Sequence, residues 1–123
     1  MQAIQQPGEL LVVGSINMDL VFQTSKLPSL GETVISGSFC QINGGKGANQ
    51  AVTAARGCQV PVKLFAAVGG DAYAASIMES FKMEPRLSIE LIQQFADAST
   101  GVASIMVDDQ GENMICVAAG ANE

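Results

Sequence analysis

Hydrophobic residues occur in short runs separated by polar or glycine-rich segments, a pattern typical of strands that alternate with helices. The run from Leu10 to Gly14 predicts a buried strand near the start of the chain. The segment from Ala48 to Arg56 is rich in alanine and lacks proline, which predicts a helix. The run from Val62 to Val68 is apolar on both sides of its period, so it predicts a central strand of a parallel sheet. This order indicates the α/β class.

A second helix is predicted from Asp71 to Met83, with Asp71 as its N-cap and with Pro85 after its end. The residues expected to face the core from this helix are Ile77, Met78, Phe81 and Met83. The next segment, Ile89 to Phe95, fits a strand or a helix equally well by its pattern.

The segment from Leu20 to Ile42 predicts an extended excursion between the first strand and the first helix. Its turn is expected at Leu27 to Gly31, flanked by β-prone pieces at Phe22 and at Thr33 to Ile35. Such a hairpin is unusual in a simple α/β unit and suits a lid.

A second hairpin is predicted near the end of the chain, with strands at Gly101 to Val107 and Met114 to Ala118 around the turn Asp108 to Gly111. Because a lone hairpin is marginal in water, we expect the two hairpin regions to form one small sheet, separate from the main α/β layer.

Composition narrows the possible functions. The 123 residues are 48% hydrophobic and 15% charged, which is typical of one globular domain at most. The net charge of −6 argues against nucleic-acid binding, and the absence of histidine argues against the usual zinc sites. Cys40, Cys58 and Cys116 are expected to be reduced thiols that pack in the core. Residues 1–9 carry no basic cluster, so we expect no targeting signal and a cytoplasmic location.

The stretch from Gly44 to Ala51, Gly-Gly-Lys-Gly-Ala-Asn-Gln-Ala, is a candidate ligand site. It matches neither the Walker A loop nor the dinucleotide fingerprint. A glycine-rich turn at a helix start presents unpaired backbone N–H groups, which suit a phosphate or the oxygens of a polyol. By its shape alone, the stretch is equally well explained as a structural turn.

Asn17 and Asp19 form a second candidate group, since side chains two residues apart share one face of an extended chain. A carboxylate beside an amide can bind sugar hydroxyls, whereas the alternative is that both residues organise a turn after the first strand.

Taken together, several segments resemble the ribokinase-like carbohydrate kinase family in sequence and order. They are Gly14 to Asp19 (Gly-Ser-Ile-Asn-Met-Asp), Leu27 to Val34 (Leu-Pro-Ser-Leu-Gly-Glu-Thr-Val), Gly44 to Ala51, Ser99 to Ala103 (Ser-Thr-Gly-Val-Ala), Gln110 to Asn113 (Gln-Gly-Glu-Asn) and Gly120 to Asn122 (Gly-Ala-Asn). Lys46 directly after the double glycine favours a ribokinase-like sugar pocket.

The resemblance implies a parallel sheet with flanking helices and a small β-sheet lid, with lid segments at about residues 17–43 and 100–118. It also implies ATP-dependent phosphorylation of the primary hydroxyl of D-ribose to ribose 5-phosphate, with Mg²⁺ as cofactor, K⁺ as activator and a homodimer formed through the lids. It makes Ile89 to Phe95 a strand. The substrate-binding residues it implies are Asn17, Met18, Asp19, Gly45, Lys46, Gly47, Ala48 and Asn49.

In such kinases the catalytic base is the aspartate of a Gly-Ala-Gly-Asp segment, which the 123 residues do not contain. Residues 1–123 are therefore expected to be the truncated N-terminal part of one ribokinase-like domain, without a catalytic residue or a metal site and inactive alone. The alternative is a non-catalytic binding or dimerisation module.

Overall fold

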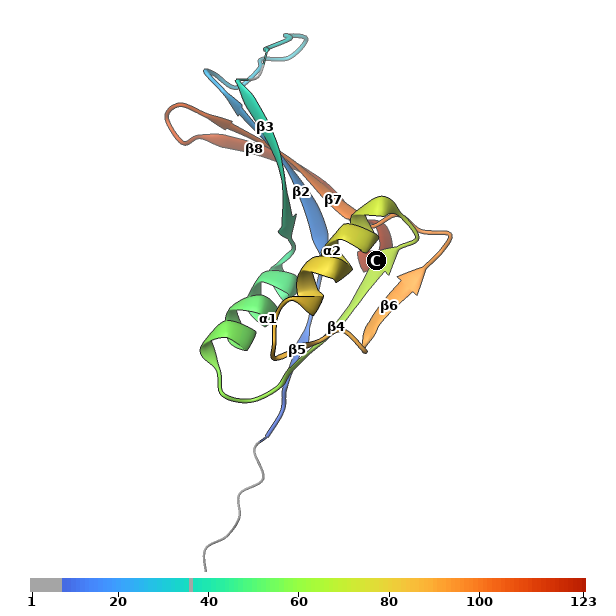
Figure 1. The fold of residues 1–123 in the computed structure, drawn as a ribbon. Coiled ribbons are helices and arrows are strands. Elements are labelled where there is room, and N and C mark those ends of the chain that lie inside the picture. Colours follow the sequence, from blue (N-terminus) through green and yellow to red (C-terminus); the bar gives the residue numbers. More distant parts are fainter. Residues whose placement is uncertain (1–7, 36) are drawn as a thin grey trace, which may run out of the picture.

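The computed structural model describes residues 8–35 and 37–123. The expectation that residues 1–9 carry no targeting signal falls almost entirely on residues 1–7, which lie outside the described residues. Figure 1 shows a parallel sheet with two helices, from which a second sheet extends. The elements of the first part are β1 (Leu10–Val13), α1 (Lys46–Gly57), β4 (Val62–Gly69), α2 (Ala72–Lys82), β5 (Leu87–Ser88) and β6 (Ile92–Phe95).

The strand β4 is the centre of the first sheet. It pairs in parallel with β1, β5 and β6, as expected of a strand that is apolar on both sides. The prediction of a strand in the segment Ile89 to Phe95 is confirmed over its second half, which forms β6.

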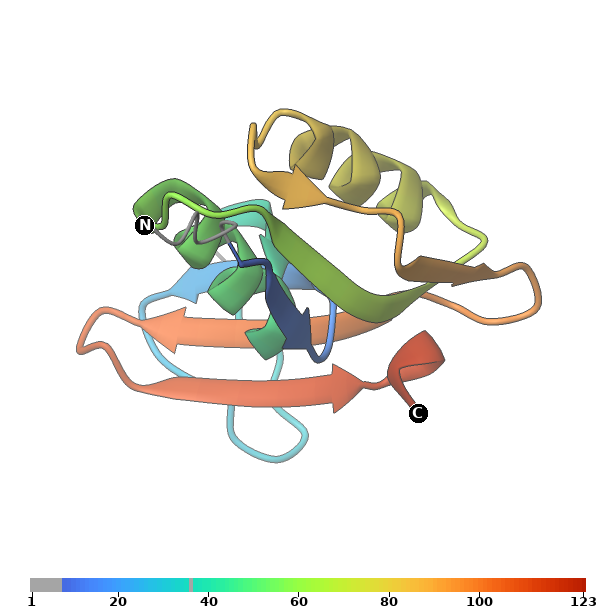
Figure 2. The same cartoon turned by 90° about the horizontal axis from the view of Figure 1, so that it is seen from below.

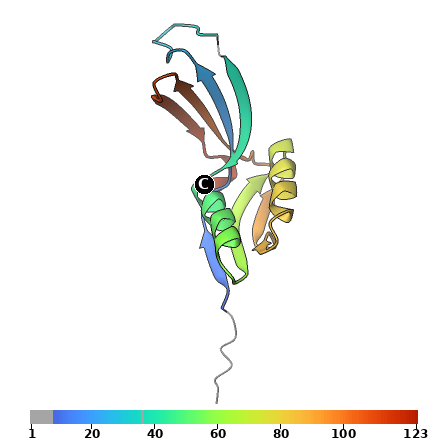
Figure 3. The ribbon, with the colours of Figure 1, turned by 60° about the vertical axis from the view of Figure 1, so that its left-hand side comes forward.

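Alternate residues of β4 face the helices. Val62, Leu64 and Val68 are fully buried, against Ala51 of α1 and Ile77 of α2 in the same core cluster. Neither α1 nor α2 covers the other face of this sheet (Figure 3). Its side chains are exposed, at 55% for Leu11, 67% for Val13 and 44% for Phe65.

The second sheet contains β2 (Asn17–Thr24), β3 (Ser38–Gly44), β7 (Gly101–Asp108) and β8 (Asn113–Ala118), in the order β3-β2-β7-β8. The strands β2 and β7 run parallel, and the outer pairs run antiparallel. Figure 3 shows this sheet extending away from the helices and the parallel sheet. The predicted union of the two hairpin regions in one small sheet is confirmed.

A short 3-10 helix, η1 (Gly120–Asn122), follows β8. It returns the chain to the junction of the two sheets, where its residues approach β4, and Figure 2 shows the C-terminus beside the end of β8.

Three expectations about elements are wrong in detail. The β-prone piece Thr33 to Ile35 lies outside any strand, because the pairing of β3 with β2 ends at Ser38 opposite Gln23. Instead Glu32 accepts a hydrogen bond from Ser29 N (3.0 Å) and pairs with Lys26, which organises this loop. The first helix begins at Lys46 rather than Ala48, and the second ends at Lys82.

The expected core positions also need correction. Met83 lies after the last residue of α2 and is 80% exposed, so it does not fill the core, and Met78 is only partly buried. Cys40 and Cys116 are exposed because they lie on the outer strands of the second sheet, and Cys58 is partly buried. All three are free thiols.

Candidate functional site

The glycine-rich turn packs against the backbone that joins β1 to β2. A Cβ on Gly14 would lie 2.9 Å from Gly47 Cα, and a Cβ on Gly45 would lie 2.6 Å from the carbonyl oxygen of Ser15. Gly45 also has a φ of +93°, a conformation that side chains disfavour. The glycines therefore allow the start of α1 to approach the Ser15 segment closely.

Backbone N–H groups at this helix start are less available than expected. Lys46 N donates to Ser15 Oγ (3.2 Å), and Ala48 N donates to the Ser15 carbonyl oxygen (3.0 Å). The expectation of unpaired N–H groups is thus wrong for these two residues. The backbone N–H groups of Lys46 and Ala48 are therefore not available to a ligand, which leaves the side-chain ammonium group of Lys46 as that residue's donor.

The face of β2 that carries Asn17 and Asp19 opens onto a cavity. Both residues lie within the strand, two positions apart, as the pattern predicts. The prediction that they merely form a turn is therefore wrong. Met18 points to the opposite side, where it is only 3% exposed and belongs to the core.

The cavity has a volume of about 450 Å³ and lies where the second sheet meets the start of α1. Polar groups from β2 and α1 line one part of it, and apolar residues of β7 and β8 line another. Its lining residues are Ser15, Asn17, Asp19, Gly45, Lys46, Asn49, Ala103, Ile105, Ile115, Val117, Ala119 and Asn122.

Five of the eight residues expected to bind substrate therefore share one cavity, although the two segments are well separated in sequence. These five are Asn17, Asp19, Gly45, Lys46 and Asn49. Met18, Gly47 and Ala48 do not line it, because they pack into the junction and the core.

Among the described residues, the charged side chains of the cavity have no ion-pair partner. Neither Asp19 nor Lys46 takes part in a salt bridge with another residue in the described ranges. Burial raises the pKa of the Asp19 carboxyl above its ordinary value, because water solvates the carboxylate less well there. A ligand with hydroxyl donors would replace part of that lost solvation.

Two polar residues that line the cavity, Ser15 and Asn122, were not among the expected site residues. Asn122 could have been suspected from the Gly-Ala-Asn segment, which belongs to the family resemblance. Its contact with Ile16, 106 residues away, has no local signal in the sequence.

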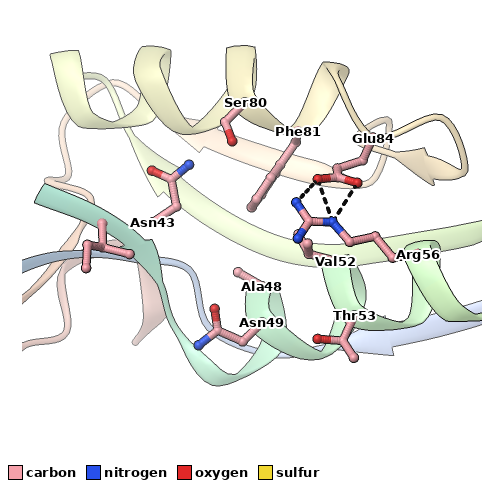
Figure 4. Close-up of a pocket in the computed structure, with 10 residues that line it drawn as sticks. Asn43, Ala48, Asn49, Val52, Thr53, Arg56, Ser80, Phe81 and Glu84 are labelled. Carbon is pink, nitrogen blue, oxygen red and sulfur yellow. Dashed lines mark hydrogen bonds and ion pairs between the residues drawn. The ribbon is translucent and has the colours of Figure 1, made fainter.

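A second cavity of about 450 Å³ lies between α1 and α2 (Figure 4). Its two charged residues already form an ion pair. Arg56 Nε donates to both carboxylate oxygens of Glu84, at 3.0 and 3.1 Å, and one of its terminal nitrogens donates as well. Because the charges of this cavity are already paired, it is the weaker candidate for a polar ligand.

No cluster of three or more His, Cys, Asp or Glu residues that could hold a metal ion occurs in the described ranges. No helix in the part of the chain that the structure describes is long and apolar enough to cross a membrane.

Comparison with known proteins agrees with this fold. The family model for the pfkB family of carbohydrate kinases matches residues 8–123. The chain belongs to this family.

Ribokinases are among its similar relatives. A ribokinase of Mus musculus is 42% identical over 118 residues, which cover 96% of this chain and 36% of the mouse protein. Among solved structures, a ribokinase from Cryptococcus neoformans var. grubii serotype A in complex with ADP has a TM-score of 0.82 at 34% identity, covering 92% of this chain and 35% of that one. Arabidopsis thaliana ribokinase complexed with ribose and ATP has a TM-score of 0.80 at 30% identity, covering 96% of this chain and 38% of that one. The chain thus spans little more than a third of the length of these relatives.

Proposed function

We propose that this chain supplies the sugar-binding part of a ribokinase, an enzyme that transfers a phosphoryl group from ATP to the primary hydroxyl of D-ribose and forms ribose 5-phosphate. The observation that carries the proposal is the convergence of Asn17, Asp19, Lys46 and Asn49 on one cavity. In this proposal the second sheet acts as a lid over the sugar.

The chemistry of the cavity suits a small polyol. Asp19 offers only acceptors, Lys46 offers only donors, and the two amides offer both. Each sugar hydroxyl needs a donor and an acceptor once it is removed from water. Apolar contact with the sugar carbons can come from Ala103 and Ile105 of β7.

The cofactors and partners of the proposal follow the relatives. The Arabidopsis structure contains ribose and ATP, and the Cryptococcus structure contains ADP. ATP is therefore the proposed phosphoryl donor, with Mg²⁺ and K⁺ as the proposed ions and the cytoplasm as the proposed location. A homodimer through the lids is supported by the exposed apolar residues of the outer strand β8, Met114, Ile115 and Val117.

A ribose titration followed by calorimetry tests the proposal. We expect saturable binding of D-ribose to the protein, and at least about tenfold weaker binding by Asp19→Asn, because a hydrogen bond to a charged group is lost. Lys46→Met should weaken binding similarly. The matched controls are Asp109→Asn, in the exposed turn after β7, and Lys82→Met, at the exposed end of α2. Absence of ribose binding, or equal binding by Asp19→Asn, would contradict the proposal.

The alternative, a non-catalytic module that binds or dimerises, is favoured by the uncovered apolar face around Phe65. The two functions differ in their requirement for the cavity. Association of a module of this kind would not change in Asp19→Asn or Lys46→Met, whereas ribose binding would.

A further inference from the structure

Asn122 connects η1 to the junction between β1 and β2. Its Oδ1 accepts a hydrogen bond from Ile16 N (3.0 Å), and its Nδ2 donates to Ile16 O (3.0 Å) and Ala119 O (2.9 Å). Ile16 is fully buried and precedes the first residue of β2. One side chain thus holds the segment from which the sugar-facing strand begins.

These backbone groups determine which way the Asn122 amide faces. A backbone N–H can only donate, so the atom opposite Ile16 N has to be the oxygen of Asn122. The carbonyl oxygens of Ile16 and Ala119 can only accept, so the atom opposite them has to be the nitrogen. The orientation therefore follows from three groups with no alternative protonation.

The orientation of Asn122 in turn sets that of Asn17. Nδ2 of Asn122 lies 3.0 Å from Oδ1 of Asn17. The two hydrogens of that nitrogen are shared among three acceptors, the oxygens of Ile16, Ala119 and Asn17. Because an amide nitrogen cannot accept, Asn17 has to present its oxygen to Asn122 and leaves its own NH₂ group unused by this contact. Among the described residues no acceptor is hydrogen-bonded to Asn17 Nδ2, and Asn17 lines the cavity.

We propose that Asn122 is a positioning residue that keeps the Asn17 amide in one orientation, with its NH₂ group available as a hydrogen-bond donor to a hydroxyl oxygen of the bound sugar. The sugar part of this inference rests on the proposed function. Asn17 then supplies a donor beside the acceptor Asp19 on the same face of β2.

Gly101 supports the same arrangement from β7. A Cβ at this position would lie 2.3 Å from Asn122 Nδ2 and 2.3 Å from Asn17 Oδ1. Gly101 stands opposite Asn17 in the β2–β7 register. The absence of a side chain there makes room for the two amides to meet.

The test uses Asn122→Asp, which keeps the size of the side chain and an acceptor for Ile16 N but removes the donor. Asn17 can then donate to the new carboxylate only by turning its amide, which would aim its oxygen at the sugar. We expect the side-chain amide resonances of Asn17 to shift in sugar-free protein, and D-ribose to bind about tenfold more weakly. Asn113→Asp, an exposed position on β8, is the matched control and should change neither.

A double-mutant cycle separates positioning from general damage. If Asn122 acts through Asn17, Asn122→Asp should not weaken ribose binding further in a protein that already carries Asn17→Ala. Equal weakening in both backgrounds would overturn the inference, as would Asn17 resonances that stay unchanged in Asn122→Asp.

Gly101→Ala provides a second variant if Asn122→Asp does not fold. It disturbs the same contact from another strand and should reproduce both the shift and the weaker binding. If the unmodified protein binds no ribose, the proposed function fails. The resonances of sugar-free Asn17 then still decide whether Asn122 sets its orientation.

Discussion

Asp19 and Gly44 lie on neighbouring strands so that the carboxylate of Asp19 occupies the space a side chain at position 44 would need. A Cβ on Gly44 would lie 2.2 Å from Asp19 Oδ2 and 2.4 Å from its Cγ. Gly44 is the last residue of β3 and pairs with Asn17 of β2. The glycine before the Gly-Lys-Gly turn thus makes room for the carboxylate in the cavity.

We predict that Gly44→Ala weakens ribose binding about tenfold while changing stability much less, because the new methyl group moves the end of a flexible side chain rather than backbone. Calorimetric titration and thermal unfolding measure the two effects. Gly57→Ala is the matched control, because nothing lies within 4 Å of the Cβ it would add. Unchanged ribose affinity in Gly44→Ala would show that the position of the carboxylate does not matter for binding.

Ribose binding should depend on pH through Asp19. Because burial raises its pKa, the carboxylate becomes protonated at a higher pH than an unburied aspartate. We expect ribose affinity to fall as the pH drops through that raised pKa, and to be flat over the same range in Asp19→Asn. A titration series from neutral to acidic pH measures this. A dependence that persists in Asp19→Asn would assign the effect to another group.

The raised pKa of Asp19 also affects stability, but here the ionised carboxylate is unfavourable, whereas it favours ribose binding. A carboxyl whose pKa is higher in the folded than in the unfolded protein stabilises the fold below the unfolded pKa, and that contribution is lost as the pH rises through the folded value. The ionised Asp19 therefore costs stability at neutral pH. We predict that Asp19→Asn raises the melting temperature at pH 7 while it weakens ribose binding. A lower melting temperature would contradict this reading of Asp19.

Asp71, in contrast to Asp19, stabilises the fold in its ionised form. It caps α2 by accepting from Ala74 N (3.0 Å), and it also accepts from the backbone N and the hydroxyl of buried Thr100, both at 2.7 Å. Burial of Asp71 raises its pKa, but the hydrogen bonds from Ala74 and Thr100 outweigh this, so the pKa is lower than usual. Such a group stabilises the fold above its unfolded pKa, and that contribution is lost as the pH falls through the folded value.

We predict that Asp71→Ala destabilises the protein by about 2 kcal/mol at pH 7. The substitution removes the cap of α2 and both hydrogen bonds that Thr100 donates to Asp71. The loss should shrink as the pH falls below the range in which Asp71 is ionised. Urea unfolding at several pH values measures both effects. Asp109→Ala, in the exposed turn after β7, should cost little. A loss no larger than that of Asp109→Ala would refute this role of Asp71.

The sequence predicted those features that depend on local periodicity. The period of two places Asn17 and Asp19 on one face of β2, and the continuous apolar run places β4 in the middle of the parallel sheet. Which face of a hairpin is covered depends on contacts distant in sequence, so the exposure of Cys40 and Cys116 could not be seen. The role of Ser15 could not be predicted either, because its hydrogen bonds with Lys46 and Ala48 form only when the chain folds back on itself.

The uncovered face of the parallel sheet should cause association of the 123-residue polypeptide, because apolar side chains such as Leu11, Val13 and Phe65 are exposed together. We predict concentration-dependent self-association in sedimentation experiments, reduced by Phe65→Lys. Met83→Lys, which replaces an apolar residue that is 80% exposed after α2, is the matched control and should leave association unchanged. Equal self-association of Phe65→Lys and Met83→Lys would mean that the polypeptides associate through a surface other than this face of the parallel sheet.

The last prediction is that the 123-residue polypeptide binds ribose but does not phosphorylate it. Phosphoryl transfer needs a base for the attacking hydroxyl and donors that stabilise the charge on the phosphoryl group. In the proposed function Asp19 binds the sugar, and Asp71 accepts hydrogen bonds from Ala74 and Thr100. The family resemblance implies a base in a Gly-Ala-Gly-Asp segment, and residues 1–123 do not contain that segment. Loss of a single donor that stabilises the charge of the transition state typically lowers the rate about a hundredfold to a thousandfold.

The assay compares ATP-dependent phosphorylation of D-ribose by this polypeptide and by a full-length ribokinase, at a ribose concentration that saturates both. Saturation is confirmed by calorimetry, so that a missing turnover cannot be explained by missing substrate. We expect product only from the full-length enzyme. Product formed by the 123-residue polypeptide above the background rate would contradict the prediction. Loss of that product in Asp71→Asn, or in Asp19→Asn at a ribose concentration that calorimetry shows to saturate the variant, would point to that carboxylate as the base.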